Sequence, residues 1–322
     1  FRNILETRVV FHIDFDYFYA QCEEIRSPDL RSKPVCICVF SDRGKDTGAI
    51  ATANYIARKY GAKSGIPIVF AKKRLEERKD AVFLPVDFDY YIEISEKAMK
   101  IMKNSADVFE YVGKDEAYLD VSKNKDYGGS ATWLAKAIKK EIFEKTGLIA
   151  SAGVAPNKFL AKVASDWQKP DGLFTIAPDQ VADFVKDLDV AKINGVGKVG
   201  LEHLRRWNIQ TCGDLQKWTK EDLFKEFGNW GTSLYNYARG IDHRKICNKS
   251  DRKSLSVENT FSGDLDLEDL LKKLPKIYTE LKYRLSKIPE ENYKPIKTIY
   301  LKLKTYDFEI TTVDQGYSSL AE

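Results

Sequence analysis

The chain has 322 residues, of which 43% are hydrophobic and 31% are charged, and its formal net charge is +4. This length predicts two or three domains with substantial cores. No run of residues reaches the roughly 20 apolar residues of a membrane-spanning helix, and residues 1–8 lack the apolar core of a secretory signal. The first residue is Phe rather than Met, as expected for a fragment or a trimmed chain.

The five cysteines favour an intracellular, reducing compartment. Their number is odd, none forms a CxxC pair, and three histidines are too few for the usual zinc sites. Cys36 and Cys38 lie on one face of an apolar strand, where reduced core thiols are expected. We therefore expect a cytoplasmic protein.

Strand and helix patterns alternate over residues 9–185, which predicts an α+β core around a mixed sheet. The segments predicted to be strands are 9–13, 34–40, 49–52, 81–84, 108–112, 117–121 and 148–154. The segments predicted to be helical are 16–26, 54–60, a short one after Pro67, 87–103, 129–146 and 157–167. Asp16 is a candidate cap of the first helix, and the strands on either side of residues 113–116 are expected to form a hairpin.

The pattern changes after residue 176. Residues 177–240 show short helices only, with a glycine-containing turn at 193–198. The basic stretch 243–253 is poor in core-forming residues, so we expect an extended linker that is either solvated or tracks phosphates. Beyond it the patterns predict a strand at 255–260, a helix at 267–286, and strands at 296–303 and 308–312.

Two acidic clusters about 100 residues apart carry the main functional signal. Asp14 ends the first strand, and Asp115 and Glu116 precede the strand at 117–121. A carboxylate at the end of a buried strand is costly unless a cation receives it. If the two strand ends meet, their oxygens form a site for a hard divalent cation, and magnesium fits best. Ordinary turn or cap acids are the alternative.

Three carboxylates can hold two magnesium ions roughly 4 Å apart, an arrangement that suits phosphoryl transfer. One ion activates an attacking hydroxyl, and the other neutralises a triphosphate and the leaving pyrophosphate. Asp14 is placed to bridge both ions, with the backbone carbonyl of Phe15 as a further ligand. Tyr55 and Arg58 share one helix face, although an exposed helix with an incidental arginine is the alternative. The candidate triphosphate contacts are Thr52, Tyr55, Arg58 and Lys169.

These segments, in this order, resemble the Y-family, or DinB-like, translesion DNA polymerases, especially the archaeal branch. The matching segments are 14–20, 51–55, 58–61, 65–67, 115–120, 153–158 and 169–172. The resemblance implies two Mg²⁺ ions, for which Mn²⁺ can substitute, on Asp14, Phe15, Asp115 and Glu116. Tyr19 would be the steric gate, a ring under the sugar that leaves no room for a 2′-hydroxyl. The other implied contacts are Phe18, Thr52, Tyr55, Arg58 and Lys169 to the nucleotide, and Arg43 near the templating base.

Several of these residues also have a simpler interpretation. Tyr19 can be an ordinary core aromatic, and packing explains Tyr17 and Phe18 more economically. Asp16 fits either a helix cap or an acid that supports the metal ligands. The chain departs from the family at 113–114, where Gly113 and Lys114 replace the usual serine and aliphatic residue. Lys114 would pair with the neighbouring carboxylates, reach a phosphate, or mark an engineered or lineage-specific change.

Two regions would hold DNA. The turn at 193–198 fits a helix-hairpin-helix, whose Gly195 and Gly197 let backbone N–H groups approach a phosphate, with Lys198 beside them. A plain helix–helix turn is the alternative, and Asn194 replaces the family's frequent proline. Residues 254–322 resemble the little-finger domain, which normally has one more helix and strand, so we expect this unit to be truncated.

The resemblance implies an α+β right-hand polymerase with a mixed-sheet palm, small fingers, an all-helical thumb and an α/β little finger. The expected bounds are palm 1–20 and 86–176, fingers 21–85, thumb 177–240, linker 241–253 and little finger 254–322. Such an enzyme adds dNTPs to the primer end of primer–template DNA, without proofreading, in damage tolerance and repair. We expect a nucleoid-associated monomer with no membrane partner, which reaches a sliding clamp through a tail absent from this sequence.

Two other classes compete with a polymerase. A phosphatase of the haloacid-dehalogenase type also begins with a strand that ends in DxD, but it predicts Thr or Val at the position of Phe18. Hydrolysis of an aryl phosphate without DNA would identify that class. A non-catalytic DNA-binding scaffold would have no need of Asp14, Asp115 and Glu116, and primer extension would exclude it.

Overall fold

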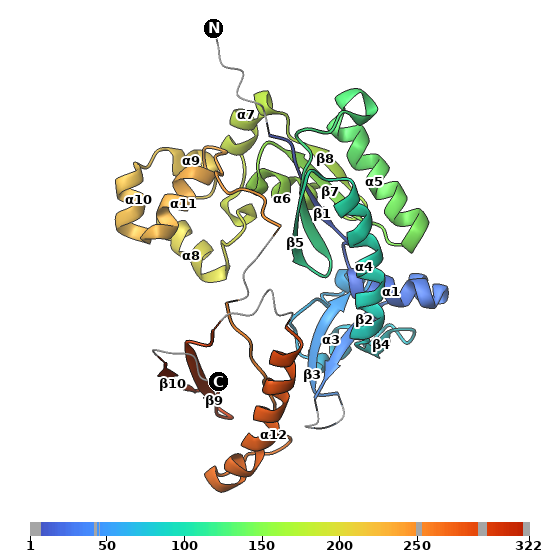
Figure 1. Cartoon of the computed structure of the whole chain (residues 1–322), viewed down its shortest axis with the longest axis vertical. Coiled ribbons are helices and arrows are strands. Elements are labelled where there is room, and N and C mark those ends of the chain that lie inside the picture. Colours follow the sequence, from blue (N-terminus) through green and yellow to red (C-terminus); the bar gives the residue numbers. More distant parts are fainter. Residues whose placement is uncertain (1–7, 42–43, 45, 249–252, 289–294, 318–322) are drawn as a thin grey trace.

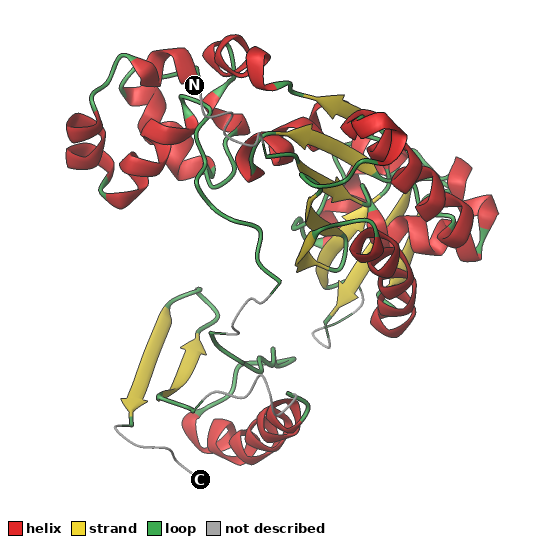
Figure 2. Ribbon diagram, turned by 45° about the horizontal axis from the view of Figure 1, so that its top comes forward, coloured by secondary structure: helices red, strands yellow, loops and turns green. Residues whose placement is uncertain are grey.

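The protein, seen here as a computed structural model, is described over residues 8–41, 44, 46–248, 253–288 and 295–317. A five-stranded sheet with its helices lies at the centre, between an all-helical region and a smaller three-stranded sheet (Figure 1). A C-terminal unit is set apart from these parts, as Figure 2 shows. None of the helices in the described ranges is long and apolar enough to cross a bilayer.

The central sheet is mixed, as predicted. Its strand order is β5–β6–β1–β7–β8, and all neighbours are antiparallel except β7 and β8. β5 and β6 form the predicted hairpin, whereas β8, only three residues long, was not predicted. The strands are β1 Val10–Asp14, β5 Val108–Gly113, β6 Glu116–Asp120, β7 Ser151–Ala155 and β8 Leu173–Thr175.

Helices cover both faces of this sheet. Because side chains alternate along a strand, Phe11 and Ile13 of β1 join the core under α1, α4 and α5, and Val10 joins the core under α6. Asp87, Ser130 and Asn157 are the N-caps of α4, α5 and α6, and each side chain accepts a hydrogen bond from a backbone N–H of its helix. The helices are α1 Phe18–Arg26, α4 Phe88–Asn104, α5 Ala131–Thr146 and α6 Lys158–Trp167.

The smaller sheet has its own core. Its order is β3–β2–β4, with β2 and β3 antiparallel and β2 and β4 parallel. Cys36 and Cys38 are buried free thiols in this core, as predicted. The elements are β2 Val35–Phe40, β3 Gly48–Ala53, β4 Val82–Pro85, α2 Tyr55–Lys59 and α3 Ile68–Arg74.

The region after the central sheet is helical, as predicted, and packs on α6 through a shared core. Its helices are α7 Val181–Lys186, α8 Lys198–Arg206, α9 Cys212–Gln216, α10 Lys220–Phe227 and α11 Asn229–Tyr237. Short 3₁₀ turns lie at 28–32, 126–129, 178–180 and 190–192.

The first part of the predicted linker is extended and is anchored at several points. The carboxylate of Asp242, 8% exposed, accepts a hydrogen bond from Phe159 N at 2.9 Å. Ile246 is buried in the core that α6 shares with the helical region. Cys247 N donates to the Glu110 carboxylate at 3.0 Å. These contacts anchor residues 241–248 to the central part of the molecule, but six of these eight residues are exposed, so the solvated linker and the phosphate-tracking linker both stay predictions.

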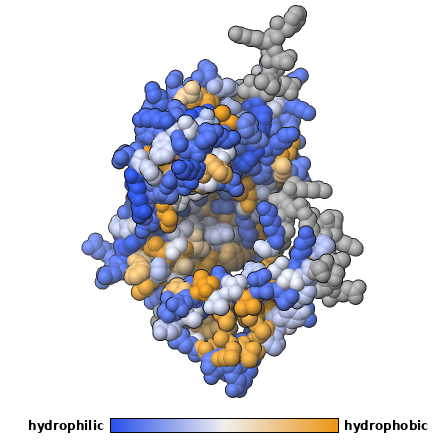
Figure 3. Space-filling view, turned by 90° about the vertical axis from the view of Figure 1, so that its left-hand side faces the viewer, coloured by the Kyte–Doolittle hydropathy of each residue, from blue (hydrophilic) through white to orange (hydrophobic). Residues whose placement is uncertain are grey.

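The C-terminal unit consists of α12 Leu267–Ser286 and an antiparallel pair, β9 Thr298–Lys304 and β10 Ile310–Gly316. The helix matches its prediction, but the strand predicted at 255–260 is wrong. β9 and β10 pair with each other, and residues 255–260 make no ladder with either, although a strand needs such a partner. Both strands are exposed along their length, and apolar side chains gather in the lower part of Figure 3.

We predict that Gly153→Ala destabilises the fold by about 1–3 kcal/mol, because α6 packs directly on β7 at this glycine. A Cβ there would lie 2.0 Å from Ala161 O and 2.3 Å from Ser165 N. Gly197→Ala is the matched control, because its Cβ meets no atom within 4 Å. The measurement is the urea unfolding midpoint by circular dichroism. Equal midpoints for Gly153→Ala and the wild type would contradict this packing.

Candidate active site

The two acidic clusters meet where β1 and β6 pair. Asp14 lies directly opposite Glu116 in the antiparallel register. One residue further, the Phe15 N–H donates to the Asp115 carbonyl at 2.8 Å. The strand pairing therefore brings the backbones of Asp14, Asp115 and Glu116 to one place, as expected for two strand ends that meet.

Two lysines provide the positive charge that buried carboxylates require. Lys169 Nζ lies 2.7 Å from Asp14 Oδ1 and 2.9 Å from Asp166 Oδ1. Lys162, which α6 carries, forms an ion pair with Glu116. Asp115 has no ion pair within the described ranges. With the side chains placed in this way, no three His, Cys, Asp or Glu residues of the described part form a metal-binding group.

His12 is a buried member of the site that the sequence analysis missed. Its Nε2 lies 3.0 Å from Glu116 Oε2, and its Nδ1 lies 2.7 Å from Ser165 Oγ. Burial lowers the pKa of His12, which favours a neutral ring. A carboxylate only accepts hydrogen bonds, so the neutral ring satisfies Glu116 by carrying its proton on Nε2. A lone histidine in an apolar strand, and Lys162 in the apolar run 159–164, were the available signals.

The two adjacent acids differ in their affinity for a proton. Burial raises the pKa of Asp115, and the nearby charges of Asp14 and Glu116 add to this effect. Burial acts in the same direction on Glu116, but hydrogen bonds from His12 and Lys162 outweigh it and bring its pKa to about 2. Glu116 is therefore fixed as a carboxylate, whereas Asp115 has no direct ion-pair partner among the described residues and gains only the more distant charge of Lys162.

Asp16 does not cap α1, so that prediction is wrong. The helix begins at Phe18, and its N-cap is Tyr17, which makes no side-chain capping bond. Asp16 has a left-handed backbone (φ 55°), and its carboxylate accepts from Ser151 Oγ at 2.7 Å and from Asp171 N at 3.0 Å. It thereby ties the turn after Lys169 to β7, which agrees with the alternative of a supporting acid.

Tyr55 and Arg58 share one face of α2, as predicted. The Arg58 guanidinium lies 4.9 Å from the centre of the Tyr55 ring. Burial raises the pKa of Tyr55, and the charges of Asp16 and Asp14 raise it further. The Tyr55 hydroxyl is thus close enough to Asp14 and Asp16 for their charges to disfavour its ionisation. Thr52 is buried on β3, three residues before Tyr55.

Tyr19 and Phe18 differ in exposure. Tyr19 is half-buried, and its pKa is raised by burial and then by the charge of Asp115. The Phe18 ring is 3% exposed and packs in the core, so only the backbone of Phe18 can face a nucleotide.

Lys114 turns away from the acids beside it. Its ammonium lies 5.1 Å from the centre of the Phe88 ring, and it forms no ion pair with Asp115 or Glu116 in the described structure. The expected pairing is therefore wrong, because the aromatic face of Phe88 receives the cation instead. Contact with a phosphate stays a prediction.

The predicted DNA contacts lie on the helical region. Gly195 has φ +97°, which favours glycine, and Gly197 is the N-cap of α8. A Cβ on either glycine would meet no atom within 4 Å, so the turn is open to a large partner. Lys198 is exposed at the first position of α8. Arg43 lies outside the described residues.

Family models match most of the chain. The impB/mucB/samB family matches residues 13–166, the thumb domain of DNA polymerase iota matches 191–242, and the impB/mucB/samB C-terminal domain matches 252–319. A DNA polymerase IV of Nitrosopumilus maritimus is 57% identical over 286 residues, which are 84% of this chain and 79% of that protein. A DNA polymerase IV of Francisella philomiragia is 47% identical over 316 residues, which are 98% of this chain and 88% of that protein.

Solved structures agree with these relatives. A chimera of the Y-family polymerases Dbh and Dpo4 has a TM-score of 0.88 at 35% identity, over 98% of this chain and 89% of that one. An insertion ternary complex of Dbh DNA polymerase has a TM-score of 0.72 at 33% identity, with the same coverage. These matches confirm the right-hand α+β architecture and leave no support for a phosphatase or a non-catalytic scaffold. The chain belongs to the DinB-like Y-family of DNA polymerases and is a DNA-directed DNA polymerase of the translesion type.

Proposed function

We propose that this enzyme extends a primer 3′-end with dNTPs by two-metal phosphoryl transfer, without proofreading. The observation that carries the proposal is the convergence of Asp14, Asp115 and Glu116 at the paired ends of β1 and β6. Phosphoryl transfer depends mainly on positioning and charge neutralisation, and this acidic cluster bordered by cations suits both.

The donor atoms fit Mg²⁺ or Mn²⁺. All are oxygens, as hard divalent cations prefer. Asp115 has no cation partner among the described residues. The Phe15 carbonyl accepts a bond from Gln21 Nε2 at 2.5 Å and retains a second lone pair as a ligand. Asp14, Phe15, Asp115 and Glu116 would hold the ions, which supply activation of the primer hydroxyl and neutralisation of the triphosphate.

The chain's own cations would bind and orient the triphosphate. Lys169 reaches Asp14 from the turn that Asp16 holds, so a small rotation of its long side chain would bring the ammonium to a phosphate oxygen. Tyr55, Arg58 and Thr52 would contact the same group from the other side. His12 and Lys162 would keep Glu116 charged and oriented.

Sugar selection would depend on Tyr19. Its half-buried ring lies near Asp115. The preceding residue is Phe18, whose backbone would complete the nucleotide site. A ring fixed under the deoxyribose excludes a 2′-hydroxyl by contact alone, with no need for a polar group.

We further propose that the enzyme binds primer–template DNA and a dNTP together, by analogy with the Dbh insertion ternary complex. Gly195, Gly197 and Lys198 would contact phosphates, and Arg43 would lie near the templating base. The hollow in Figure 3 between the upper body and the C-terminal unit would take the duplex.

The proposed bounds are palm 1–20 and 86–176, fingers 21–85, thumb 177–240, linker 241–253 and little finger 254–322. We propose a monomer acting at cytoplasmic, nucleoid DNA with a sliding clamp.

Asp115→Ala should reduce primer extension with Mg²⁺ by about 100-fold or more, because it removes a central charge of the site. The measurement is single-nucleotide insertion on a primer–template. Asp120→Asn is the matched control at the other end of β6, where the carboxylate accepts hydrogen bonds from Ser122 and lies 4.0 Å from Arg8 Nε. Equal extension by the wild type and Asp115→Ala would remove the assignment.

Tyr19→Ala should lower the preference for deoxyribonucleotides over ribonucleotides by at least about tenfold, or about 1.4 kcal/mol. Loss of the ring would open space beside C2′ of the incoming nucleotide, where a 2′-hydroxyl would then fit. The measurement is the ratio of kcat/KM for dCTP and CTP opposite the same template base. An unchanged ratio, with normal insertion of dCTP, would rule out a gate at Tyr19.

A further inference from the structure

The proposed gate ring has a buried support. The Tyr19 ring stacks on Tyr91 of α4, with ring centres 4.8 Å apart and planes 19° apart. Phe88, one turn earlier on α4, meets Tyr19 edge-on at 5.8 Å. Tyr91 is fully buried. The side of Tyr19 that faces α4 is therefore covered by two rings, which restrict its movement in that direction.

Tyr91 is itself fixed by a buried acid. Its hydroxyl donates to Glu23 Oε1 at 2.8 Å. Glu23 is 5% exposed and lies one turn after Tyr19 on α1. A buried carboxylate needs a cation, and Arg26 provides it through two bonds, Nη2 to Oε1 at 2.6 Å and Nε to Oε2 at 3.2 Å.

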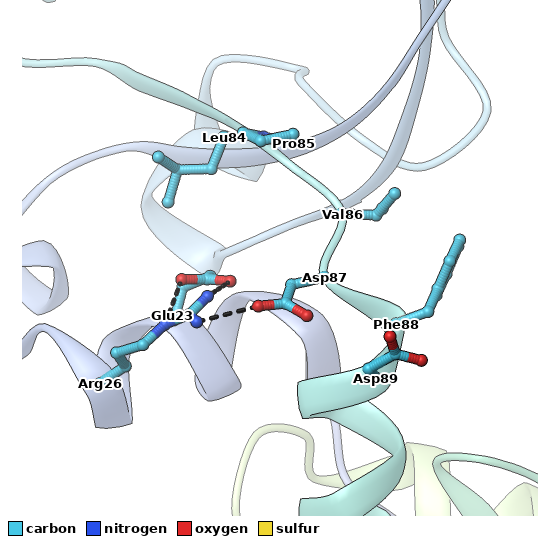
Figure 4. A pocket seen from close by; sticks show the side chains of 8 residues that line it. All are labelled: Glu23, Arg26, Leu84, Pro85, Val86, Asp87, Phe88 and Asp89. Atoms are coloured by element: carbon cyan, nitrogen blue, oxygen red, sulfur yellow. Dashed lines mark hydrogen bonds and ion pairs between the residues drawn. The ribbon is translucent and has the colours of Figure 1, made fainter.

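Arg26 also links the two helices. Its Nη1 bonds to Asp87 Oδ2 at 2.9 Å, and Asp87 caps α4 by accepting from Tyr90 N. Figure 4 shows the guanidinium between Glu23 and Asp87 at the wall of a surface pocket. The contacts thus run from Arg26 to Glu23, from Glu23 to Tyr91, and from Tyr91 to Tyr19, which returns the chain of contacts to α1.

We propose that Tyr91, fixed by Glu23 and Arg26, is a positioning residue that sets the enzyme's selectivity for deoxyribonucleotides. This inference rests on the proposed role of Tyr19 as the gate. Steric exclusion works only if the ring cannot retreat when a 2′-hydroxyl presses on it. Tyr91 lies behind Tyr19 and resists that retreat, and the hydrogen bond to Glu23 keeps Tyr91 from yielding in turn.

Tyr90 provides a matched control on the same helix. Its hydroxyl donates to the Cys22 carbonyl of α1 at 3.2 Å, so it also links α4 to α1. Its ring contacts Tyr91, but no ring contact joins it to Tyr19 in the described structure. Tyr90→Phe thus tests loss of a helix–helix hydrogen bond without loss of the support behind the gate.

The experiment measures kcat/KM for dCTP and CTP insertion on one primer–template with Mg²⁺. The variants are Tyr91→Leu, Tyr91→Phe, Tyr90→Phe and Tyr19→Ala. Tyr91→Leu should lower the dCTP/CTP ratio about tenfold, or about 1.4 kcal/mol, mainly by raising CTP insertion. Tyr91→Phe, which keeps the stacked ring, should lower the ratio less. Tyr90→Phe should leave it unchanged. Circular dichroism checks that each variant is folded.

The outcomes separate this inference from the function beneath it. If both Tyr91 variants keep the wild-type ratio while Tyr19→Ala loses it, the gate stands and the role of Tyr91 is wrong. If Tyr90→Phe lowers the ratio as much as Tyr91→Phe, general loosening of the helices explains the effect and the inference is overturned. If Tyr19→Ala also keeps the ratio, or the wild type inserts no dCTP, the failure lies in the proposed function.

Discussion

The structure depends on how the negative charges of three acids are neutralised where β1 pairs with β6. This register sets Asp14 opposite Glu116 and draws Asp115 close through the Phe15 backbone. Like charges facing each other on paired strands repel, and burial increases the cost. The fold offsets that cost locally, with Lys169 on Asp14 and with Lys162 and His12 on Glu116. The register thus brings three acids to one end of the β1–β6 pair, where we propose that divalent cations bind.

Helix α6 connects this site to the rest of the molecule. It carries Lys162 to Glu116 of β6 and Ser165 to His12 of β1, leads into the turn that bears Lys169, and shares a core with the helical region. The glycine at 153 lets the helix lie directly on β7. On the other face, Tyr19 of α1 stacks on Tyr91 of α4, and the Tyr91 hydroxyl donates to Glu23 of α1.

Much of this could be predicted from local pattern. Apolar segments predicted the strands, cap residues such as Asn157 marked helix starts, and the acidic clusters at strand ends predicted the candidate site. His12 and Lys162 escaped because their role depends on register and on the packing of α6, which no local window contains. Asp16 was misplaced because its partner Asp171 is far along the chain. The segment 255–260 has strand composition, but a strand also needs a neighbour that composition cannot supply.

The most direct test of the central claim is a crystal structure of the protein with primer–template DNA, a non-hydrolysable dNTP and Mn²⁺, located by anomalous scattering. The account predicts manganese within about 2.2 Å of oxygens of Asp14 and Asp115, with Lys169 moved onto the triphosphate and His12 still bonded to Glu116. Manganese bound elsewhere, with Asp14 still paired to Lys169 and the three carboxylates facing apart, would contradict it.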